Sequence, residues 1–295
     1  MSQPITRRLF CLTPAASALW GQQAATDQDL VFRTSVRLIE VYATVFDNHG
    51  KYVDGLQRDR FRISENNSPV TVSTFEGSGS GLTCAVLLDT TGSMQKELPA
   101  VKNAIVNLVD ELGESDQIGI FGFSRRLDTL QPFTQDKKAA KNAILRTRAF
   151  GATALFDAIS QAARELLTKQ GRKALVVFTD GKDNASVLSA HAAIQRAKKA
   201  GVPVYTVGQS EALTDKKLMD QLEEISKATG GKSYEAKKRD DVEKIFSDIS
   251  SDMKHTYLLA YPAPEVAEKS WRKIQVEILQ AKNFKVRARE GYFPD

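Results

Sequence analysis

The strongest constraint on this fold is an apolar run that ends abruptly in a carboxylate. Residues 85–88 carry no polar side chain, which is typical of a strand buried on both faces of a parallel sheet. Asp89 follows at once, and Thr91 and Ser93 place two hydroxyls at alternate positions after it. These oxygen donors suit Mg²⁺, Mn²⁺ or Ca²⁺ better than Zn²⁺. The alternative is an ordinary strand-to-helix turn in which Ser93 caps a helix.

A second apolar run, residues 174–178, also ends in an aspartate, Asp180, after one threonine. The carboxyl ends of parallel strands lie at one edge of a sheet, where open α/β sheets bind their ligands. We therefore expect Asp89 and Asp180 to face the same site. Thr153 is the third candidate donor, because it follows two small residues that allow close approach of its loop. A threonine before a helix can also be simply an N-cap.

Strands and helices alternate along residues 83–254. Residues 98–112 place apolar side chains on one helical face, and Gly113 ends that helix. Ser189 and Thr214 are predicted to cap two later helices. This order predicts an α/β fold with a doubly wound, mostly parallel sheet.

Short strands with a period of two flank this unit on both sides. Residues 36–75 alternate apolar and polar side chains between turns, which predicts a β meander. The same alternation returns over residues 257–292. Residues 77–81 contain only glycine and serine, a composition typical of a flexible linker.

The two flanking segments are predicted to form one small β-sandwich. Two or three isolated strands are marginal in water, and each segment has one apolar face to bury. The predicted boundaries are 30–76 for the N-terminal half, 83–254 for the inserted α/β domain and 255–295 for the C-terminal half.

The candidate donors resemble a known metal site. An Asp-x-Ser/Thr-x-Ser loop, a later threonine and a later strand-end aspartate resemble the metal-ion-dependent adhesion site (MIDAS) of von Willebrand factor A (VWA) domains. The resemblance implies a VWA-like, Rossmann-like fold, and Thr91 stands where the family more often has serine. The flanking strands and residues 285–293 are also similar to a bacterial, exported VWA-related family. The metal ligands that the resemblance implies, direct or through water, are Asp89, Thr91, Ser93, Thr153 and Asp180.

The resemblance implies protein binding rather than catalysis. Two carboxylates nearly neutralise a Mg²⁺ ion, and an open coordination position then favours a carboxylate, Asp or Glu, from a partner protein. We expect Mg²⁺, with Mn²⁺ or Ca²⁺ as substitutes, and no enzymatic activity. Asp89 is expected to face solvent, so Asp89→Ala should abolish Mg²⁺ binding without unfolding the chain.

The alternative is a magnesium-dependent phosphohydrolase of the haloacid dehalogenase type, which also begins with an aspartate after a strand. Such enzymes need a second carboxylate two residues later, and Thr91 occupies that place. Lys173 and Lys182 are present, but neither is a clear equivalent of the phosphate-contacting lysine.

Composition excludes several other classes of protein. The 295 residues are 42% hydrophobic and 26% charged, as in globular proteins with a substantial core. The net charge of +5 is scattered, with no basic run among aromatics, so we expect no nucleic-acid partner. The three histidines are far apart and lack neighbours at zinc-ligand spacing.

The first residues indicate export. Arg7 and Arg8 followed by the apolar stretch 9–20 resemble a twin-arginine signal, with small residues suited to cleavage near its end. We therefore expect residues 1–25 to be an export segment and the mature protein to be periplasmic or secreted, without a transmembrane segment. Cys84 would then be the remaining cysteine, a buried thiol with no disulfide partner.

Overall fold

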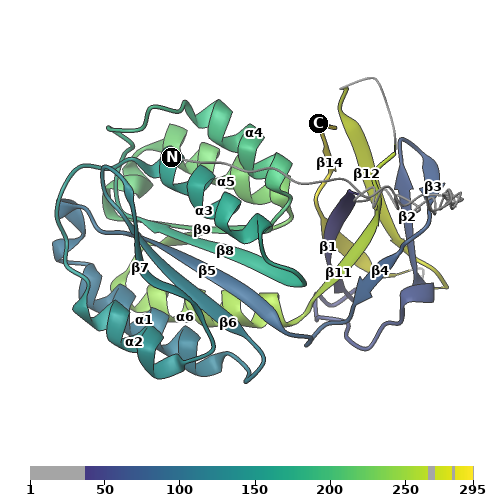
Figure 1. The fold of residues 1–295 in the computed structure, drawn as a ribbon, viewed down its shortest axis with the longest axis horizontal. Helices are drawn as coiled ribbons and strands as arrows, with labels where there is room; N and C mark the ends of the chain where they lie inside the picture. Colours follow the sequence, from purple (N-terminus) through teal and green to yellow (C-terminus); the bar gives the residue numbers. More distant parts are fainter. Residues whose placement is uncertain (1–36, 265–269, 281–282, 295) are drawn as a thin grey trace, which may run out of the picture. The chain divides into compact units, whose positions relative to one another are not determined.

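The computed structural model describes residues 37–264, 270–280 and 283–294. The predicted export segment, residues 1–25, lies outside these ranges. The described chain contains one mixed α/β sheet and two smaller antiparallel sheets (Figure 1).

The central sheet has the strand order β10-β9-β8-β5-β6-β7. Its strands are β5 (Leu82–Asp89), β6 (Gln117–Phe123), β7 (Leu127–Thr134), β8 (Arg172–Thr179), β9 (Val204–Gln209) and β10 (Ser233–Ala236). All neighbours pair in parallel except β7, which runs antiparallel to β6 at the edge. The predicted doubly wound, mostly parallel sheet is therefore confirmed. Strand β7 was not predicted, because Asp128 and Pro132 interrupt its apolar pattern.

Three helices cover each face of this sheet (Figure 1). The bounds are α1 (Leu98–Glu111), α2 (Lys137–Arg146), α3 (Leu155–Leu167), α4 (Ala190–Ala200), α5 (Lys216–Thr229) and α6 (Arg239–Lys254). Side chains alternate along β5, so Val86 and Leu88 pack with α1 and α6, whereas Ala85 and Leu87 pack with α3 and α4. Every residue of β5 and β8 is buried, which explains their continuous apolar runs.

Local capping sets several helix ends. Ser189 caps α4 as predicted, because its side chain accepts a hydrogen bond from the backbone N–H of Ala192. The prediction for α5 is wrong by one residue: Asp215, not Thr214, accepts from the N–H of Leu218. Both residue types are good caps, and the sequence pattern alone does not separate adjacent ones.

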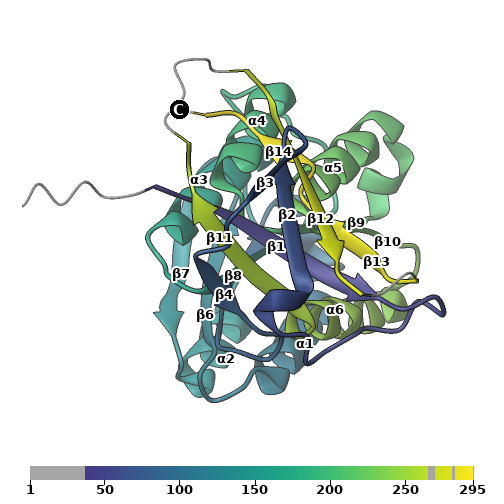
Figure 2. The same cartoon turned by 90° about the vertical axis from the view of Figure 1, so that its right-hand side faces the viewer.

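The two antiparallel sheets have the orders β13-β1-β11-β4 and β14-β12-β2-β3. Their strands are β1 (Leu38–Phe46), β2 (Phe61–Glu65), β3 (Ser68–Val70), β4 (Thr74–Glu76), β11 (Thr256–Pro262), β12 (Arg272–Ile278), β13 (Lys285–Ala288) and β14 (Gly291–Tyr292). Strand β1 pairs with β11 and β13, and β2 pairs with β12 (Figure 2). Both sheets thus combine strands from the two chain ends, as the predicted fold class requires.

The predicted meander of the N-terminal strands is wrong. Among β1 to β4, only β2 and β3 pair with one another. Ile39, Val41 and Val45 of β1 do point into one core with Tyr257 and Leu259 of β11. Period-two alternation identifies the buried face of a strand but not its partner.

The linker expectation for residues 77–81 is also corrected. The N–H of Gly79 donates to the carbonyl of Lys254 over 2.9 Å, and the Ser80 hydroxyl donates to the carbonyl of Gly77 over 2.8 Å. The carbonyl of Ser80 accepts from the guanidinium of Arg172. Hydrogen bonds therefore hold a segment whose composition is that of a flexible linker.

Candidate metal centre

Two strand ends at the centre of the sheet define the site. The chain leaves β5 toward β6 on one side and later returns to β8 on the other side. The carboxyl ends of β5 and β8 therefore flank a topological switch point, where open α/β sheets bind ligands. Asp89 is the last residue of β5, and Asp180 follows directly after β8.

Hydrogen bonds join four of the five predicted donors. Asp89 Oδ1 accepts from the N–H of Thr91 over 2.9 Å and from its hydroxyl over 2.7 Å. The oxygens of Thr91 and Ser93 are 3.0 Å apart. Ser93 Oγ in turn donates to Asp180 Oδ1 over 2.8 Å. The fold thus places both aspartates and both hydroxyls in one connected cluster.

The helix-capping interpretation of Ser93 is wrong. Residues Gly92–Gln95 form a short 3₁₀ helix whose N-cap is Thr91, with no side-chain capping bond. The hydroxyl of Ser93 is directed to Asp180 instead. Its position two residues after Thr91 therefore serves the cluster and not the helix.

Thr153 lies on a loop that is bonded to the first one. The N–H of Phe150 donates to the carbonyl of Thr90 over 2.6 Å, and the N–H of Gly92 donates to the carbonyl of Gly151. Thr153 is 4% exposed and does not cap α3, whose N-cap is Ala154 without a side-chain bond. Within the described ranges its hydroxyl makes no hydrogen bond to the other four predicted donors, so the structure brings Thr153 near the cluster only through its loop.

The cluster concentrates negative charge away from water. Asp89 is 0% exposed, so the expectation that it faces solvent is wrong. Burial raises the pKa of Asp89, and hydrogen bonds from Thr91 and Thr179 oppose this effect. Burial, together with the charge of Asp89, raises the pKa of Asp180 to about 6. A divalent cation would relieve this repulsion and match the hard oxygen donors, so the residues present fit such an ion.

The cluster contains only two carboxylates, so its remaining oxygens come from hydroxyl groups. In the described part of the chain, no group of three or more His, Cys, Asp or Glu side chains gathers to hold a metal. An ion held at this cluster would therefore need hydroxyl oxygens beside the two carboxylates, and the hydroxyls of Thr91 and Ser93 lie within the hydrogen-bonded cluster.

Three supporting residues were missed at the sequence level. Thr179 donates its hydroxyl to Asp89 Oδ2 over 2.8 Å, on the side of the carboxylate opposite Thr91. Asn184 accepts from the N–H of Thr153 over 2.9 Å, and Asp183 accepts from the N–H of Phe156 over 3.1 Å. Residues 179–184, directly after the second apolar run, are mostly polar, and this density of polar side chains was the sequence feature that could have indicated these roles.

The two lysines considered for phosphate contact each interact with a carboxylate outside the cluster. Lys173 is buried at the start of β8, at the other end of that strand from Asp180, and it donates to Glu40 over 2.8 Å. Lys182 is near Asp180 in sequence but pairs with Asp215 at 3.5 Å. Neither arrangement favours a phosphohydrolase.

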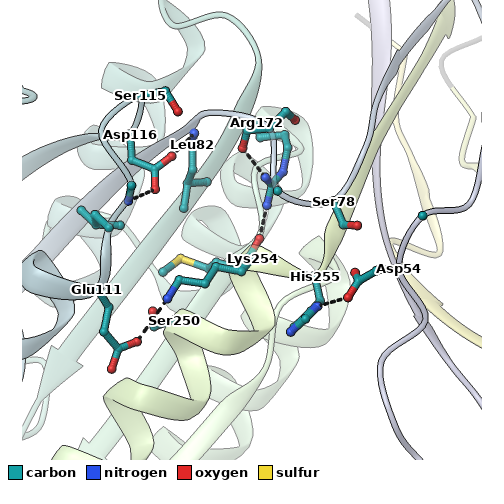
Figure 3. A pocket seen from close by; sticks show the side chains of 16 residues that line it. Asp54, Ser78, Leu82, Glu111, Ser115, Asp116, Arg172, Ser250, Lys254 and His255 are labelled. Carbon is teal, nitrogen blue, oxygen red and sulfur yellow. Dashed lines mark hydrogen bonds and ion pairs between the residues drawn. The ribbon is translucent and has the colours of Figure 1, made fainter.

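A cavity of about 510 Å³ lies at the opposite edge of the sheet, beside Leu82 at the start of β5 (Figure 3). Its three acidic side chains already have partners: Glu111 pairs with Lys254 at 3.5 Å, Asp54 with His255 at 2.6 Å, and Asp116 accepts from the N–H groups of Leu82 and Gly113 over 2.8 Å each. Among the described residues no hydroxyl or thiol hydrogen-bonds to His255, so the cavity holds no visible nucleophile–base pair. The cluster around Asp89 is the stronger candidate site.

The geometry therefore defines an α/β domain with a candidate divalent-metal site at its switch point. The sequence model of the von Willebrand factor type A domain matches residues 85–248, more than half of the chain. The chain belongs to this family. No curated protein matches the sequence.

Solved structures show the same fold. A von Willebrand factor type A protein from Catenulispora acidiphila is 15% identical, with a TM-score of 0.55, over 89% of this chain and 75% of its own. Proximal thread matrix protein 1 from the mussel byssus, described with a zinc-occupied MIDAS motif, is 18% identical with a TM-score of 0.51. That match covers 63% of this chain and 48% of the mussel chain.

A minor pilin, PilB from Streptococcus sanguinis, is 16% identical with a TM-score of 0.49 and 59% of this chain covered. The match spans 61% of the pilin chain, less than two thirds of its length.

No helix in the described ranges of the present protein is both long and apolar enough to cross a membrane.

Proposed function

We propose that this chain is an exported protein-binding module that holds Mg²⁺ at the cluster and uses it to bind an acidic residue of a partner protein. The observation that carries the proposal is the connected set of two buried carboxylates and two hydroxyls at the switch point of the sheet. VWA domains are typically non-catalytic interaction modules, and this family membership supports binding over catalysis.

The proposed ligands are Asp89, Thr91, Ser93, Thr153 and Asp180, directly or through water. When bound, the ion would supply a positive centre with an open position for a carboxylate. Mg²⁺ is the proposed ion because every donor is a hard oxygen, and Mn²⁺ or Ca²⁺ would be substitutes. The mussel relative with zinc in its MIDAS motif makes Zn²⁺ a necessary comparison.

Asp89→Asn is expected to remove measurable Mg²⁺ binding in isothermal titration calorimetry. Asparagine preserves the size of the side chain and one oxygen for Thr91 or Thr179, so the buried position tolerates it better than alanine. The loss of one of two negative charges should weaken binding of the hard ion severely. The wild-type protein should also gain about 2.7 kcal/mol of unfolding free energy at a Mg²⁺ concentration of about 100 times Kd.

Asp220→Asn is the matched control, since Asp220 is exposed on α5, outside the cluster. It should bind Mg²⁺ like the wild type. Unchanged Mg²⁺ affinity in a folded Asp89→Asn variant would contradict the metal assignment.

Export is proposed from the twin-arginine-like segment around Arg7 and Arg8. Mass spectrometry of the protein from its native cells should find a mature chain that begins after about residue 20. A mature product that retains residues 1–20 would count against export.

A further inference from the structure

The most exposed large apolar side chains of the described residues lie on the loops of the candidate metal centre. Val187 is 93% exposed and Phe150 is 62% exposed, more than Leu145, Leu167 or any other. Val187 follows Asp180 on one loop, and Phe150 precedes Thr153 on another. Both loops are hydrogen-bonded to the backbone beside the donor cluster, through the carbonyls of Thr90 and Thr153, so we consider the two side chains together as candidates for one interaction surface.

The exposure of Val187 is fixed by its loop. The N–H groups of Val187 and Leu188 both donate to the carboxylate of Asp157 over 2.9 Å. Three residues earlier, the N–H groups of Asn184 and Ala185 both donate to the carbonyl of Thr153 over 3.0 Å. The loop is thus tied to the start of α3, and the valine is presented to solvent by a defined backbone.

Phe150 is held close to the donor cluster in a similar way. Its N–H donates to the carbonyl of Thr90, between Asp89 and Thr91. The next residue, Gly151, accepts from the N–H of Gly92. Because two hydrogen bonds join this loop to the Asp89 loop, Phe150 lies beside the donor cluster with its side chain exposed. A preorganised aromatic side chain is a typical anchor of protein interfaces.

The charges around the cluster are asymmetric. Arg125 follows β6, and Arg148 follows α2, which packs on β6 and β7. Both are exposed, and within the described ranges neither forms an ion pair with a carboxylate. The turn that carries Arg125 is bonded to the loop of Thr153, since Ser124 accepts from the N–H of Ala154 over 2.8 Å. On the β9 side the exposed Lys182 is already paired with Asp215 at 3.5 Å, and the exposed Glu211 follows β9.

We propose that the partner presents a carboxylate flanked by apolar residues, with a further acidic residue directed to the β6 side. The carboxylate would bind the ion, the apolar side chains would contact Phe150 and Val187, and the second acid would meet Arg125 and Arg148. This inference rests on the proposed function. A protein segment can present all three groups at once: the carboxylate for the ion, the apolar side chains beside it and the second acidic side chain.

Synthetic peptides of equal length test the proposal with the full chain in Mg²⁺. The first has a central aspartate between two leucines, with glutamates outside them. The second has serines in place of the leucines, and the third has asparagine in place of the central aspartate. The leucine peptide should bind about tenfold more tightly than the serine peptide, and the asparagine peptide should not bind.

Two variants at the exposed apolar residues and one control variant complete the test. Phe150→Ser and Val187→Ser should each bind Mg²⁺ normally in calorimetry and lose most of the preference for leucine. Leu167→Ser is the control, because Leu167 is 53% exposed at the far end of α3 and should leave the preference unchanged.

The outcomes separate this inference from the proposed function. The proposed apolar contact with Phe150 and Val187 is overturned alone in either of two cases. The leucine and serine peptides bind equally in Mg²⁺, or both Phe150→Ser and Val187→Ser keep the full preference for leucine. An Arg148→Glu variant that binds the leucine peptide as tightly as the wild type does overturns the proposed contact of a second acidic residue with Arg125 and Arg148. No Mg²⁺-dependent binding of any peptide overturns the proposed function and this inference with it.

Discussion

Deletion of residues 257–295 is expected to unfold the N-terminal strands β1 and β2. Strand β1 loses both of its neighbours, β11 and β13, and β2 loses β12. The deletion also removes Tyr257, Leu259 and Tyr261 from the core that buries β1. The remaining hairpin of β2 and β3 is too small to be stable in water by itself.

Amide hydrogen exchange measures this effect strand by strand. Protection should be lost over residues 38–46 and 61–65, while the central sheet, which loses no strand, should stay protected and keep its Mg²⁺ affinity. This result would support the proposed division into an α/β domain at 83–254 and a domain formed by 30–76 with 255–295. A chain shortened only after Tyr292 is the control, because it keeps every paired strand.

Full protection of residues 38–65 in the deletion variant would contradict a shared domain. Loss of protection throughout the central sheet would also contradict the division, since it would show that the two parts fold only together.

The part of the site that could be predicted from the sequence depends on local pattern. Apolar runs at 85–88 and 174–178 are typical of buried parallel strands, and parallel strands bring Asp89 and Asp180 to one edge of the sheet. The two hydroxyls follow Asp89 by two and four residues, and the short turn that holds them needs no distant partner.

The rest depends on contacts between distant residues. The partner of β1 is β11, more than 200 residues later, and nothing in the alternation of either strand identifies the other. Thr179 supports Asp89 through a bond across 90 residues of chain. The burial of Asp89 was missed for the same reason, because it results from loops that contribute Thr153 and Asp180.

A buried carboxylate joins the two parts of the chain. Asp252 of α6 is 1% exposed, and its Oδ2 accepts from the hydroxyl of Tyr205 on β9 over 2.7 Å. The same oxygen pairs with the guanidinium of Arg287 on β13. Oδ1 accepts from the hydroxyl of Tyr52 over 3.1 Å. Arg287 also donates to Thr44 on β1 over 2.9 Å. One carboxylate thus links a helix and a strand of the α/β part to the antiparallel sheet.

Asp252→Ala is expected to lower the free energy of unfolding by about 3–5 kcal/mol. The substitution leaves the Arg287 cation without its partner, and it leaves two tyrosine hydroxyls without their acceptor. The Arg287 side chain is only 25% exposed and would lose its carboxylate partner, so the loss exceeds that of a surface ion pair. Urea unfolding followed by circular dichroism measures the change.

Asp248→Ala is the matched control, one turn earlier on α6, because Asp248 is exposed and should change stability by no more than about 0.5 kcal/mol. The double variant Asp252→Ala with Arg287→Met should recover part of the loss, since it removes the stranded cation and restores apolar packing. Equal stability of the Asp252→Ala and Asp248→Ala variants would show that the network does not hold the two parts together. A double variant that is no more stable than Asp252→Ala alone would instead locate the cost in the lost packing of Arg287 rather than in its unpaired charge.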